Sequence, residues 1–473
     1  MAQDALAELK ALANIIQSSV EQIEAVVTAN SFTYPSPNAP YSLESEAPRT
    51  HPIIQSAGSL ITSAAAQLMT LVRPAPVTIL DTMMQFHVST AMRTAISTHV
   101  AEILRDAGPE GKHASEIAKP TKVHPGKLAR TLRLLATNHI FTEVNPDVFA
   151  NNRLSTVFDT GKSVEELLVN PESKHIGTLG MTSIIEHVLD EGFKSSAYLT
   201  ETILDPDYGH ATEPGRTALN KACGFKGDLW SWLEGPENRL RLARFGAAMN
   251  GVKNMTSAEV ILEGYGWKNL PKGSLVVDVG GGVGSKSFIL ADHHSHLRFV
   301  VQDRDGVVGD AYWKKNMPKA LESGRVKLQG HNFFDPQPAQ DDDVSVFLVC
   351  QVLHDWADEY CLTILKHLRL AAGPKTQLIV VDQLIACACD EPATHEIPGA
   401  EVPTPPKPLL TNMGRAGSMS YNTDLMMMGL FNGQERTITY LRDLLNQAGW
   451  EIIAVHHDTQ SGIKYQKAIA VPK

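Results

Sequence analysis

The carboxyl-terminal half of the chain is predicted to have an α/β fold, and the rest a mostly helical one. From residue 273 onward, short apolar runs alternate with stretches of helical periodicity, which is typical of a mainly parallel sheet covered by helices. A glycine-rich turn, Asp278 to Gly284, follows one apolar run and opens a helix. With 473 residues, 43% of them hydrophobic, the chain is long enough for two or three domains.

The amino-terminal part is predicted to be helical. The first 30 residues repeat leucine and isoleucine at helical spacing, and further helices are expected over 52–71 and 77–104. A polar, proline-bearing stretch from Ser31 to His51 separates the first two helices. Neither a signal peptide nor a membrane span is expected, because the start lacks a basic cluster and no apolar run approaches 18 residues.

Residues 113–158 have the pattern of a winged helix. A short helix and a proline-bearing turn precede a second helix that starts near Pro125, and a hairpin follows around residues 145–147. Such a motif can bind DNA. The second helix carries three basic side chains, Lys127, Arg130 and Arg133. The formal net charge of −10 argues against this use, so a winged-helix DNA-binding protein is a remote alternative.

Seven strands are expected in the carboxyl-terminal region. The first five are predicted at 274–279, 297–302, 325–329, 344–350 and 377–382. The last two, 450–457 and 464–471, are separated only by a loop and should form an antiparallel hairpin. Residues 160–265 are expected to be largely helical, and residues 390–420 to form a long loop near the functional edge of the sheet.

The glycine turn has the spacing of a nucleotide-type cofactor site. It contains Gly280, Gly281, Gly282 and Gly284, with the acid Asp278 two residues before the first glycine. Glycine allows a tight turn and lets a ligand lie against bare backbone. Because the last glycine comes one residue earlier than in the dinucleotide pattern GxGxxG, the turn suits S-adenosylmethionine, which has no pyrophosphate. A glycine-rich turn without a ligand is the alternative.

Four further residues stand where chemistry is expected, outside the carboxyl ends of the strands. Asp303 comes about 20 residues after the glycine turn, where a carboxylate commonly accepts hydrogen bonds from the cofactor ribose. His354 is suited to removing a proton from a weak acid, and Asp382 and Glu435 could orient its ring. Each residue also has a purely structural alternative, as a turn cap, a backbone-bonded histidine or a salt-bridge partner. Trp356 is either a platform for adenine or part of the core.

Cysteine and histidine usage predicts a cytoplasmic protein without a structural metal. The five cysteines are few and odd in number, which favours a reducing compartment. Cys387 and Cys389 lack the paired spacing of a zinc site. No metal is expected at His293, His294 and His296.

Four motifs in order, DVGGGVG, VQD, LHDWADEYC and GQERT, resemble the metal-independent O-methyltransferases of plant and fungal secondary metabolism. The resemblance is to caffeate- and flavonoid-type enzymes, more closely to fungal ones, and runs from about residue 75 to the end. It implies three parts: a winged-helix dimerisation domain (1–160), a helical connector that contributes to the substrate pocket (161–265), and a Rossmann-like catalytic domain that binds S-adenosylmethionine (266–473). It also implies a homodimer whose amino-terminal helices intertwine.

The resemblance implies roles for individual residues. His354 would be the general base, flanked by Asp382 and Glu435. The cofactor would be bound by Asp278, Gly280, Gly281, Gly282, Gly284, Asp303, Arg304, Asn332, Phe333 and Trp356. The substrate pocket would be lined by Phe245, Met249, Met427, Met428, Phe431 and Asn432. Two positions depart from the family pattern: Asn332 replaces an acid that contacts adenosine, and Cys350 stands where plant relatives have lysine.

The expected reaction moves the sulfonium methyl group to a phenolic or enolic oxygen of a small aromatic metabolite, without a metal. The alternative keeps the fold and the cofactor but catalyses a pericyclic or dehydration step, as some fungal relatives do. Neither nucleic acid nor a membrane is expected as a partner.

Overall fold

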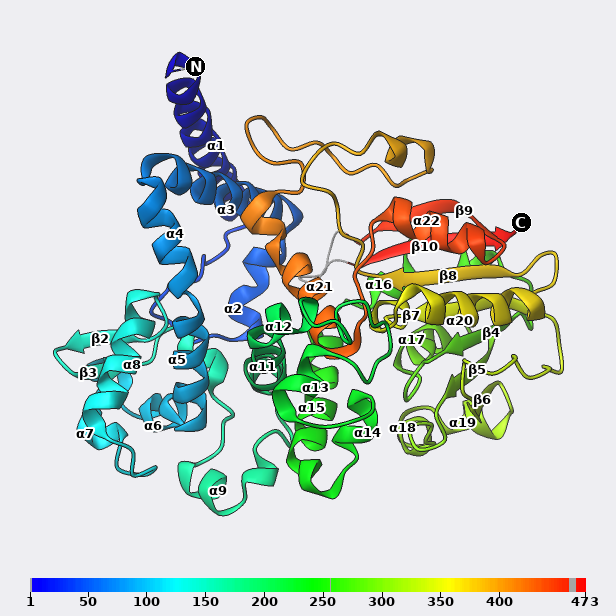
Figure 1. Cartoon of the computed structure of the whole chain (residues 1–473), viewed down its shortest axis with the longest axis horizontal. Helices are drawn as coiled ribbons and strands as arrows, with labels where there is room; N and C mark the ends of the chain where they lie inside the picture. The colour runs from blue at the N-terminus through cyan, green and yellow to red at the C-terminus, as the bar shows by residue number, and fades with distance from the viewer. Residues whose placement is uncertain (1, 256, 459–464) are drawn as a thin grey trace.

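The computed structural model describes residues 2–255, 257–458 and 465–473. Figure 1 shows helices and a small β-sheet at the amino-terminal side, a central group of helices, and the large sheet at the carboxyl-terminal side. No helix in these ranges is long and apolar enough to cross a lipid bilayer.

Five longer helices form most of the amino-terminal part: α1 (Ala2–Ala29), α3 (Pro52–Val72), α4 (Ala75–Met84), α5 (Phe86–Ser97) and α6 (Val100–Arg105). Leu12 of α1 packs against Ala64 of α3 in a small buried cluster. The single helix expected over 77–104 is wrong, because the chain breaks at Gln85 and again at His99, whose φ of 57° lies in the left-handed region. The stretch from Ser31 to His51 is not fully irregular, since it contains the short helix α2 (Leu43–Glu46).

The winged-helix pattern is confirmed. Two helices and a hairpin follow in the predicted order: α7 (Ala114–Ile117), α8 (Pro125–Thr137), β2 (Thr142–Asn145) and β3 (Val148–Ala150). A further short strand, β1 (Lys112–His113), precedes them and was not predicted. The three strands pair in the order β1-β3-β2. Leu132 and Leu135 of α8 and Phe149 of β3 are fully buried together, so the helix and the wing share one core.

The region before the sheet is helical, as expected. Its helices are α9 (Val164–Val169), α10 (Met181–His187), α11 (Phe193–Ala197), α12 (Leu199–Ile203), α13 (Ala218–Cys223), α14 (Leu229–Leu233), α15 (Arg239–Met255) and α16 (Glu259–Leu262). A π-helical turn, Val188–Gly192, joins α10 to α11. Two glycines let the backbones of α10 and α15 approach closely, because a Cβ on Gly180 would lie 2.5 Å from the Cα of Gly251.

A seven-stranded sheet forms the carboxyl-terminal part. Its strands are β4 (Leu275–Val279), β5 (Arg298–Asp303), β6 (Val326–Gly330), β7 (Val344–Cys350), β8 (Gln377–Asp382), β9 (Trp450–His457) and β10 (Gln466–Pro472). The spatial order is β6-β5-β4-β7-β8-β10-β9, parallel except for the last two strands. All seven predicted strands are confirmed within two residues, although residue 464, the predicted start of the last, lies outside the described residues. The terminal antiparallel hairpin is also confirmed.

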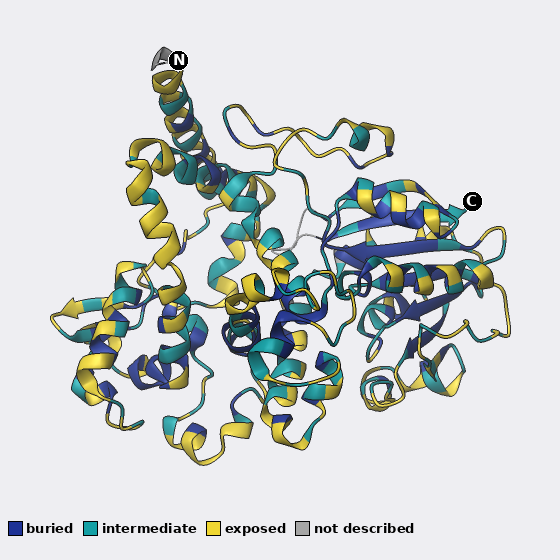
Figure 2. Ribbon diagram, viewed as in Figure 1, coloured by how far each residue is buried: buried dark blue, intermediate teal, exposed yellow. Residues whose placement is uncertain are grey.

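Helices cover both faces of this sheet, so its central strands are buried throughout (Figure 2). These helices are α17 (Ser285–His293), α18 (Ala311–Asn316), α19 (Pro318–Glu322), α20 (Asp358–Ala371) and α22 (Ile438–Gln447). The remaining helix, α21 (Ser418–Phe431), packs instead on α11 and α13 of the central group. All five residues of β4 are buried. Val277 packs with Leu365 of α20 and Leu441 of α22 on one face. Val276 packs with Leu290 of α17 on the other face. The mainly parallel order explains the continuous apolar runs in the sequence.

The loop expected over 390–420 is largely irregular, but its last residues belong to α21. Its middle lies along the edge strand β9, where the Val455 N–H donates to the Pro398 carbonyl at 2.8 Å. This contact covers one end of the sheet and removes an open edge. Its later part reaches the amino-terminal helices, since the Ser63 hydroxyl donates to the Met413 carbonyl at 2.6 Å.

Candidate active site

The glycine turn connects β4 to α17 at the carboxyl edge of the sheet. Gly280, Gly282 and Gly284 have φ values of 68°, 60° and 79°, a region that only glycine adopts freely. A Cβ on Gly280 would lie 2.8 Å from Val352, and one on Gly284 2.8 Å from the Trp313 ring. At Gly282, however, a Cβ would meet nothing within 4 Å. Gly280 and Gly284 therefore let neighbouring side chains pack closely, while Gly282 borders open space.

Two carboxylates flank this turn. Asp278 is buried, its Oδ2 accepts a hydrogen bond from the Ser287 hydroxyl at 2.6 Å, and burial raises its pKa to about 6. Asp303 accepts the N–H of Gly282 on Oδ2 and that of Arg304 on Oδ1, each at 2.8 Å. Both oxygens of Asp303 retain a lone pair for a ligand hydroxyl. The turn and the end of β5 are thus held together as one unit.

Aromatic side chains stand beside the turn. Trp356 packs edge-on against Phe333 and Phe334, with ring centroids 5.9 and 4.7 Å apart. Phe333 also approaches the turn, since a Cβ on Gly280 would lie 3.5 Å from its ring. This cluster could present an apolar surface to a flat base. Trp356 packs on its neighbours but is only half-buried. This position is compatible with either role considered for it, core packing or a platform for adenine.

The two remaining polar residues assigned to the cofactor are turned to other partners. Asn332 is exposed, and its amide oxygen accepts the Phe334 N–H at 3.2 Å. The guanidinium of Arg304 pairs with Glu234 at 3.2 Å and lies over the Trp230 ring at 5.8 Å. Their contacts with a cofactor stay predictions.

His354 lies in the short 3-10 turn after β7, and its ring is held from two sides. Its Nδ1 is 2.9 Å from Glu435 Oε1, and its Nε2 is 3.6 Å from Asp355 Oδ1. Only 16% of the side chain is exposed. Burial lowers the pKa of His354, but the nearby Asp355 and Glu435 carboxylates outweigh burial and raise it to about 10. The imidazole is therefore a strong base for a histidine.

Asp382 ends β8 on the same side of the sheet and is also buried. Burial raises its pKa to about 7, and the charge of Glu435 adds to this, while His354 opposes it. Within the described ranges, Oδ1 of Asp382 and Oε2 of Glu435 are buried without a hydrogen-bond partner. Buried oxygens of this kind are costly unless a ligand or water satisfies them. The structure therefore brings the three predicted catalytic residues together.

Arg436 is a residue of this site that sequence reasoning missed, although it follows Glu435 directly. Its guanidinium donates to the carbonyls of Leu353 and Trp356, each at 2.8 Å, and pairs with Asp358 at 2.9 Å. It therefore ties down both ends of the turn that carries His354. Only 3% of its side chain is exposed, so these bonds form away from water.

The residues predicted to line the substrate pocket fall into two groups. Met427 and Phe431 are buried with Leu219 and Leu229, and Phe245 packs against this cluster. Trp230, which sequence reasoning did not single out, joins them through ring contacts with Phe245 at 5.2 Å and Phe431 at 5.6 Å.

The other predicted pocket residues are less enclosed. Met249 is 43% exposed, and Met428 is half-buried. Asn432 ends α21 in a left-handed conformation with φ of 57°, and its amide donates to the Glu213 carbonyl at 2.9 Å. Asn432 therefore connects α21 to the loop before α13, which is a structural role in addition to the predicted one.

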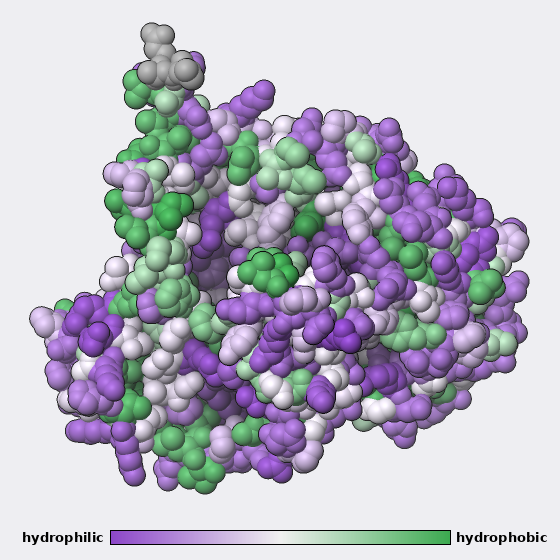
Figure 3. Space-filling view, viewed as in Figure 1, coloured by the Kyte–Doolittle hydropathy of each residue, from purple (hydrophilic) through white to green (hydrophobic). Residues whose placement is uncertain are grey.

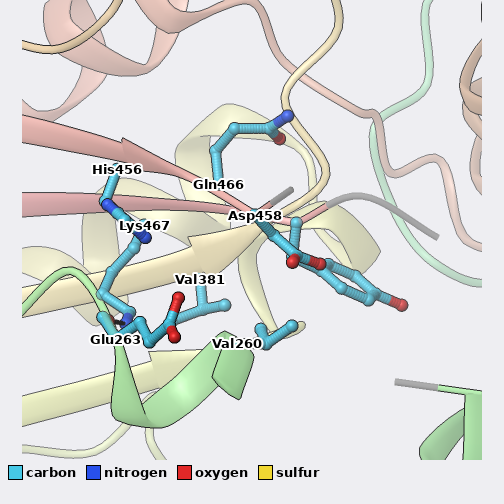
Figure 4. Close-up of a pocket in the computed structure, with 8 residues that line it drawn as sticks. Val260, Glu263, Val381, His456, Asp458, Gln466 and Lys467 are labelled. Atoms are coloured by element: carbon cyan, nitrogen blue, oxygen red, sulfur yellow. Dashed lines mark hydrogen bonds between the residues drawn. The ribbon is translucent and has the colours of Figure 1, made fainter. Parts of the chain in front are cut away.

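A small cavity lies behind the site, between α16 and the end of the sheet (Figure 4). It is lined by Val260, Glu263, Val381, His456, Asp458, Tyr465, Gln466 and Lys467. Lys467 is 2% exposed, and its ammonium donates to the carbonyls of Ile261 and Glu263 at the end of α16. Burial lowers its pKa to about 8. Sequence reasoning missed this lysine, because a single lysine in a strand gives no signal of burial.

A sheet with this strand order, a glycine turn after β4 and a terminal antiparallel hairpin defines a methyltransferase-type fold. Residues 209–402 match the O-methyltransferase domain model and residues 80–161 the O-methyltransferase dimerisation domain model. An O-methyltransferase of Armillaria gallica is 45% identical over 451 residues, 95% of each chain. The 4-O-methyltransferase 1 of Phanerochaete chrysosporium is 40% identical over 469 residues, 98% of this chain and 99% of the relative. The chain belongs to this family of S-adenosylmethionine-dependent O-methyltransferases, which confirms the resemblance.

Solved structures show the same fold. OxaC in complex with sinefungin and meleagrin has a TM-score of 0.63 at 18% identity, covering 97% of this chain and 99% of OxaC. A pericyclic reaction enzyme has a TM-score of 0.61 at 17% identity, covering 89% of this chain and 95% of that enzyme. The fold therefore serves more than one kind of reaction, and the site must decide between them. The predicted domain boundaries near 160 and 265 stay predictions.

Proposed function

We propose that this protein transfers the methyl group of S-adenosylmethionine to a phenolic or enolic hydroxyl of a small aromatic compound, with His354 as the general base. The observation that carries the proposal is the contact of 2.9 Å between His354 Nδ1 and Glu435 Oε1. Because Glu435 binds Nδ1, the other ring nitrogen, Nε2, which lies 3.6 Å from Asp355 Oδ1, would accept the proton of the acceptor. Asp382 adds a third acid within electrostatic range of the ring.

The residues at the glycine turn fit the proposed cofactor. Open space beside Gly282 leaves room for a ligand against the backbone, and Asp278 has a buried Oδ1 without a partner within the described ranges. That oxygen suits the ammonium of the methionine part, while Asp303 suits the ribose hydroxyls. The aromatic cluster of Phe333 and Trp356 would contact the adenine. Gly280, Gly281 and Gly284 would shape the turn itself.

The proposed base is matched to its substrate. A phenol has a pKa of about 10, and the carboxylates around His354 raise the pKa of its ring to about 10 as well. When bound, S-adenosylmethionine would supply the methyl group on a sulfonium centre, together with a positive charge near the ring. A cation at that position lowers the pKa of His354 and so favours the neutral form that a base requires. The carboxylates keep the resulting imidazolium stable once it holds the proton.

A second group of aromatic side chains, distinct from the cluster of Phe333 and Trp356, supports a flat acceptor. Phe245, Trp230 and Phe431 form a continuous row of rings. The relatives from Phanerochaete chrysosporium are named for transfer to O-4 and O-3, which agrees with a hydroxyl acceptor. A pericyclic or dehydration reaction is the second candidate, because a pericyclic enzyme shares the fold.

DNA binding is not supported by the charges of the winged helix. Arg133, one of the three basic side chains of its second helix, pairs with Glu143 and Asp147, each at 2.8 Å. A paired guanidinium is less available to a phosphate. We therefore assign the winged helix to dimerisation, in agreement with the family domain that it matches.

We further propose that α4 contributes to the homodimer. None of its residues is buried, and Ile79, Leu80 and Met83 are 65%, 58% and 57% exposed. Figure 3 shows hydrophobic side chains gathered over this group of amino-terminal helices. A large exposed apolar surface of this kind is typical of a protein interface.

Incubation with methyl-labelled S-adenosylmethionine and a panel of phenols and hydroxybenzoates tests the proposed reaction. We expect a labelled methyl ether and S-adenosylhomocysteine in equal amounts. The variant His354→Ala should lose turnover yet still bind S-adenosylhomocysteine. Full activity in this variant would remove the base assignment, and conversion of a substrate without S-adenosylhomocysteine would favour the pericyclic candidate.

A further inference from the structure

A second histidine–glutamate pair lies in the helical connector. His187 is the last residue of α10 and is 6% exposed. Its Nδ1 is 3.0 Å from Oε2 of Glu191, which lies in the π-helical turn. The pair repeats the arrangement of His354 and Glu435, in which a buried carboxylate holds Nδ1. Single π-helical turns within α-helices are frequent at functional sites.

The carboxylate of this pair is itself neutralised and fixed. Oε1 of Glu191 is 2.5 Å from the guanidinium of Arg244 and 3.0 Å from that of Arg241. The neighbouring Asp190 binds Arg244 at 2.8 Å and Arg93 of α5 at 2.6 Å. Two guanidinium groups therefore hold Glu191 in place, and its contact with Nδ1 orients the His187 ring.

The other nitrogen of His187 is left without a partner. Across the described ranges, Nε2 makes no hydrogen bond or ion pair. With the proton on Nδ1, Nε2 presents a lone pair that accepts a hydrogen bond. The His187 side chain is only 7% exposed, yet Nε2 is not among the buried atoms that lack a partner in the described ranges, so this nitrogen stays accessible to a ligand that donates a hydrogen bond.

The His187 ring stands at the end of the aromatic row. It contacts Phe245 edge-on at 5.2 Å, Phe245 contacts Trp230 at 5.2 Å, and Trp230 contacts Phe431 at 5.6 Å. Phe431 ends α21, four residues before Glu435. The π-helical turn also packs on α21, because a Cβ on Gly192 would lie 3.3 Å from the sulfur of Met426. The row of rings therefore runs from His187 to Phe431, close in the chain to the segment that carries Glu435.

We propose that His187, oriented by Glu191, binds a second hydroxyl of the acceptor, distinct from the hydroxyl that is methylated. The preferred acceptor is then a dihydroxylated aromatic compound whose ring lies against Phe245 and Trp230. One hydroxyl faces His354 and loses its proton, and the other donates a hydrogen bond to Nε2 of His187. This inference rests on the proposed function, since it uses the same pocket.

Equilibrium binding tests the inference separately from turnover. Calorimetry in the presence of S-adenosylhomocysteine compares phenol with catechol, resorcinol and hydroquinone, and 4-phenylphenol with 4,4′-dihydroxybiphenyl. In the wild type, we expect the second hydroxyl to tighten binding roughly tenfold for at least one of these compounds, the value of one good hydrogen bond to a buried group. His187→Leu should abolish this preference, and His187→Gln, which keeps an acceptor atom, should restore part of it.

A matched control is available on the same connector. His175 pairs with Glu186 at 2.8 Å but has no ring contact with Phe245 in the described structure. His175→Leu should keep the preference for a second hydroxyl. If His187→Leu is unstable, Glu191→Gln replaces it, because loss of the carboxylate frees the ring and should weaken the same preference.

Three results would overturn the inference: no preference in the wild type, an unchanged preference in folded His187→Leu, or equal losses in His187→Leu and His175→Leu. The formation of S-adenosylhomocysteine by the wild type with these phenols reports on the proposed reaction. If the wild type turns over these phenols and His187→Leu keeps the binding preference for a second hydroxyl, only the proposed contact with His187 is refuted. If the wild type shows the preference but no turnover, the contact is supported and the proposed methyl transfer is refuted.

Discussion

His354 and Glu435 stand 81 positions apart in the sequence, yet Nδ1 of the first lies 2.9 Å from Oε1 of the second. Two backbone contacts make this meeting specific. The N–H of Gln434 donates to the His354 carbonyl at 2.9 Å, and a Cβ on Gly433 would lie 2.1 Å from the same oxygen. The segment that carries Glu435 is therefore fastened to the turn that carries His354, so the ring orientation depends on both the turn after β7 and the loop between α21 and α22.

Protonation of His354 gives the first prediction. Its pKa is raised to about 10 in the cofactor-free protein, above the unfolded value of about 6.5. The stability that it contributes is thus fully present below pH 6.5 and is lost as the pH rises through about 10. Glu435→Gln removes one of the charges responsible and should lower the pKa.

Nuclear magnetic resonance of histidine-labelled protein measures the pKa of His354 in the wild type and in Glu435→Gln. The His354 signal is assigned by its absence in His354→Asn. A His354 ring that is neutral at pH 7.5 in the cofactor-free wild type would contradict the prediction.

Cofactor space beside the glycine turn gives the second prediction. Gly282→Ala adds a methyl group where nothing lies within 4 Å, so the change should weaken S-adenosylhomocysteine binding at least roughly tenfold. Gly224→Ala is the control, because Gly224 has a similar φ of 69° and also has no atom within 4 Å of its would-be Cβ, but it caps α13. Both variants should lose about 1 kcal/mol of stability through backbone strain. Equal binding by the two variants in calorimetry would argue against a ligand at Gly282.

Removal of the buried arginine gives the third prediction. Arg436→Met leaves the carbonyls of Leu353 and Trp356 and the carboxylate of Asp358 without their donor. The free energy of unfolding should fall by about 3 kcal/mol, mainly because the carbonyls of Leu353 and Trp356 lose their buried donor. Arg442→Met is the control on the neighbouring helix. Its ion pairs with Glu396 at 3.4 Å and Asp443 at 3.3 Å lie at the surface and should contribute less than about 1 kcal/mol.

Urea unfolding measures both changes. The methyl-transfer rate of Arg436→Met should also fall, since the turn that holds His354 loses both of its anchors. Similar stability losses in the two variants would mean that Arg436 does not hold this turn.

The buried lysine at the back of the sheet gives the fourth prediction. Burial lowers the pKa of Lys467 to about 8, below the unfolded value of about 10.4. Between these values the unfolded chain binds more protons, so the contribution of Lys467 to stability rises with pH over this window, on the order of 3 kcal/mol in total. Lys467→Met should remove this rise. Urea unfolding at pH 7.5 and pH 9.5 measures the difference, and parallel behaviour of the two proteins would show that Lys467 titrates normally.

The exposed face of α4 gives the fifth prediction. Ile79→Asp should shift the homodimer toward monomer, because it places a charge in an apolar interface. Leu370→Asp is the control, since Leu370 is 84% exposed on α20 of the catalytic part. Sedimentation velocity measures the two species. A dimer that persists in Ile79→Asp would move the interface away from α4.

Local patterns in the chain were enough to predict the strands and to single out the residues that we propose for acid–base chemistry. β7, β8 and β9 occupy the predicted residues, because buried parallel strands are continuous apolar runs. His354, Asp382 and Glu435 could be found since each follows such a run or carries a family motif. The long helix over 77–104 failed, because the left-handed residue His99 leaves no mark in the apolar periodicity.

Contacts between distant segments were beyond prediction. Sequence reasoning missed the roles of Arg436, Trp230, His187 and Lys467. These roles depend on contacts with residues distant in the chain, or on burial, which the sequence around a single polar residue does not indicate. Arg304 was expected to contact the cofactor, but its guanidinium pairs with Glu234 and lies over the ring of Trp230, both in the connector. These contacts could not be predicted from the sequence.

The sequence by itself determined the α/β class, the order of the strands along the chain, the glycine turn and the family. These features depend on short-range periodicity and on residues adjacent in the chain. Only the tertiary structure decided which carboxylate holds which histidine, how far the pKa of His354 rises, and that a row of rings leads from His187 to Phe431. Those properties depend on distances and on the exclusion of water, which arise when segments 54 or more residues apart pack together.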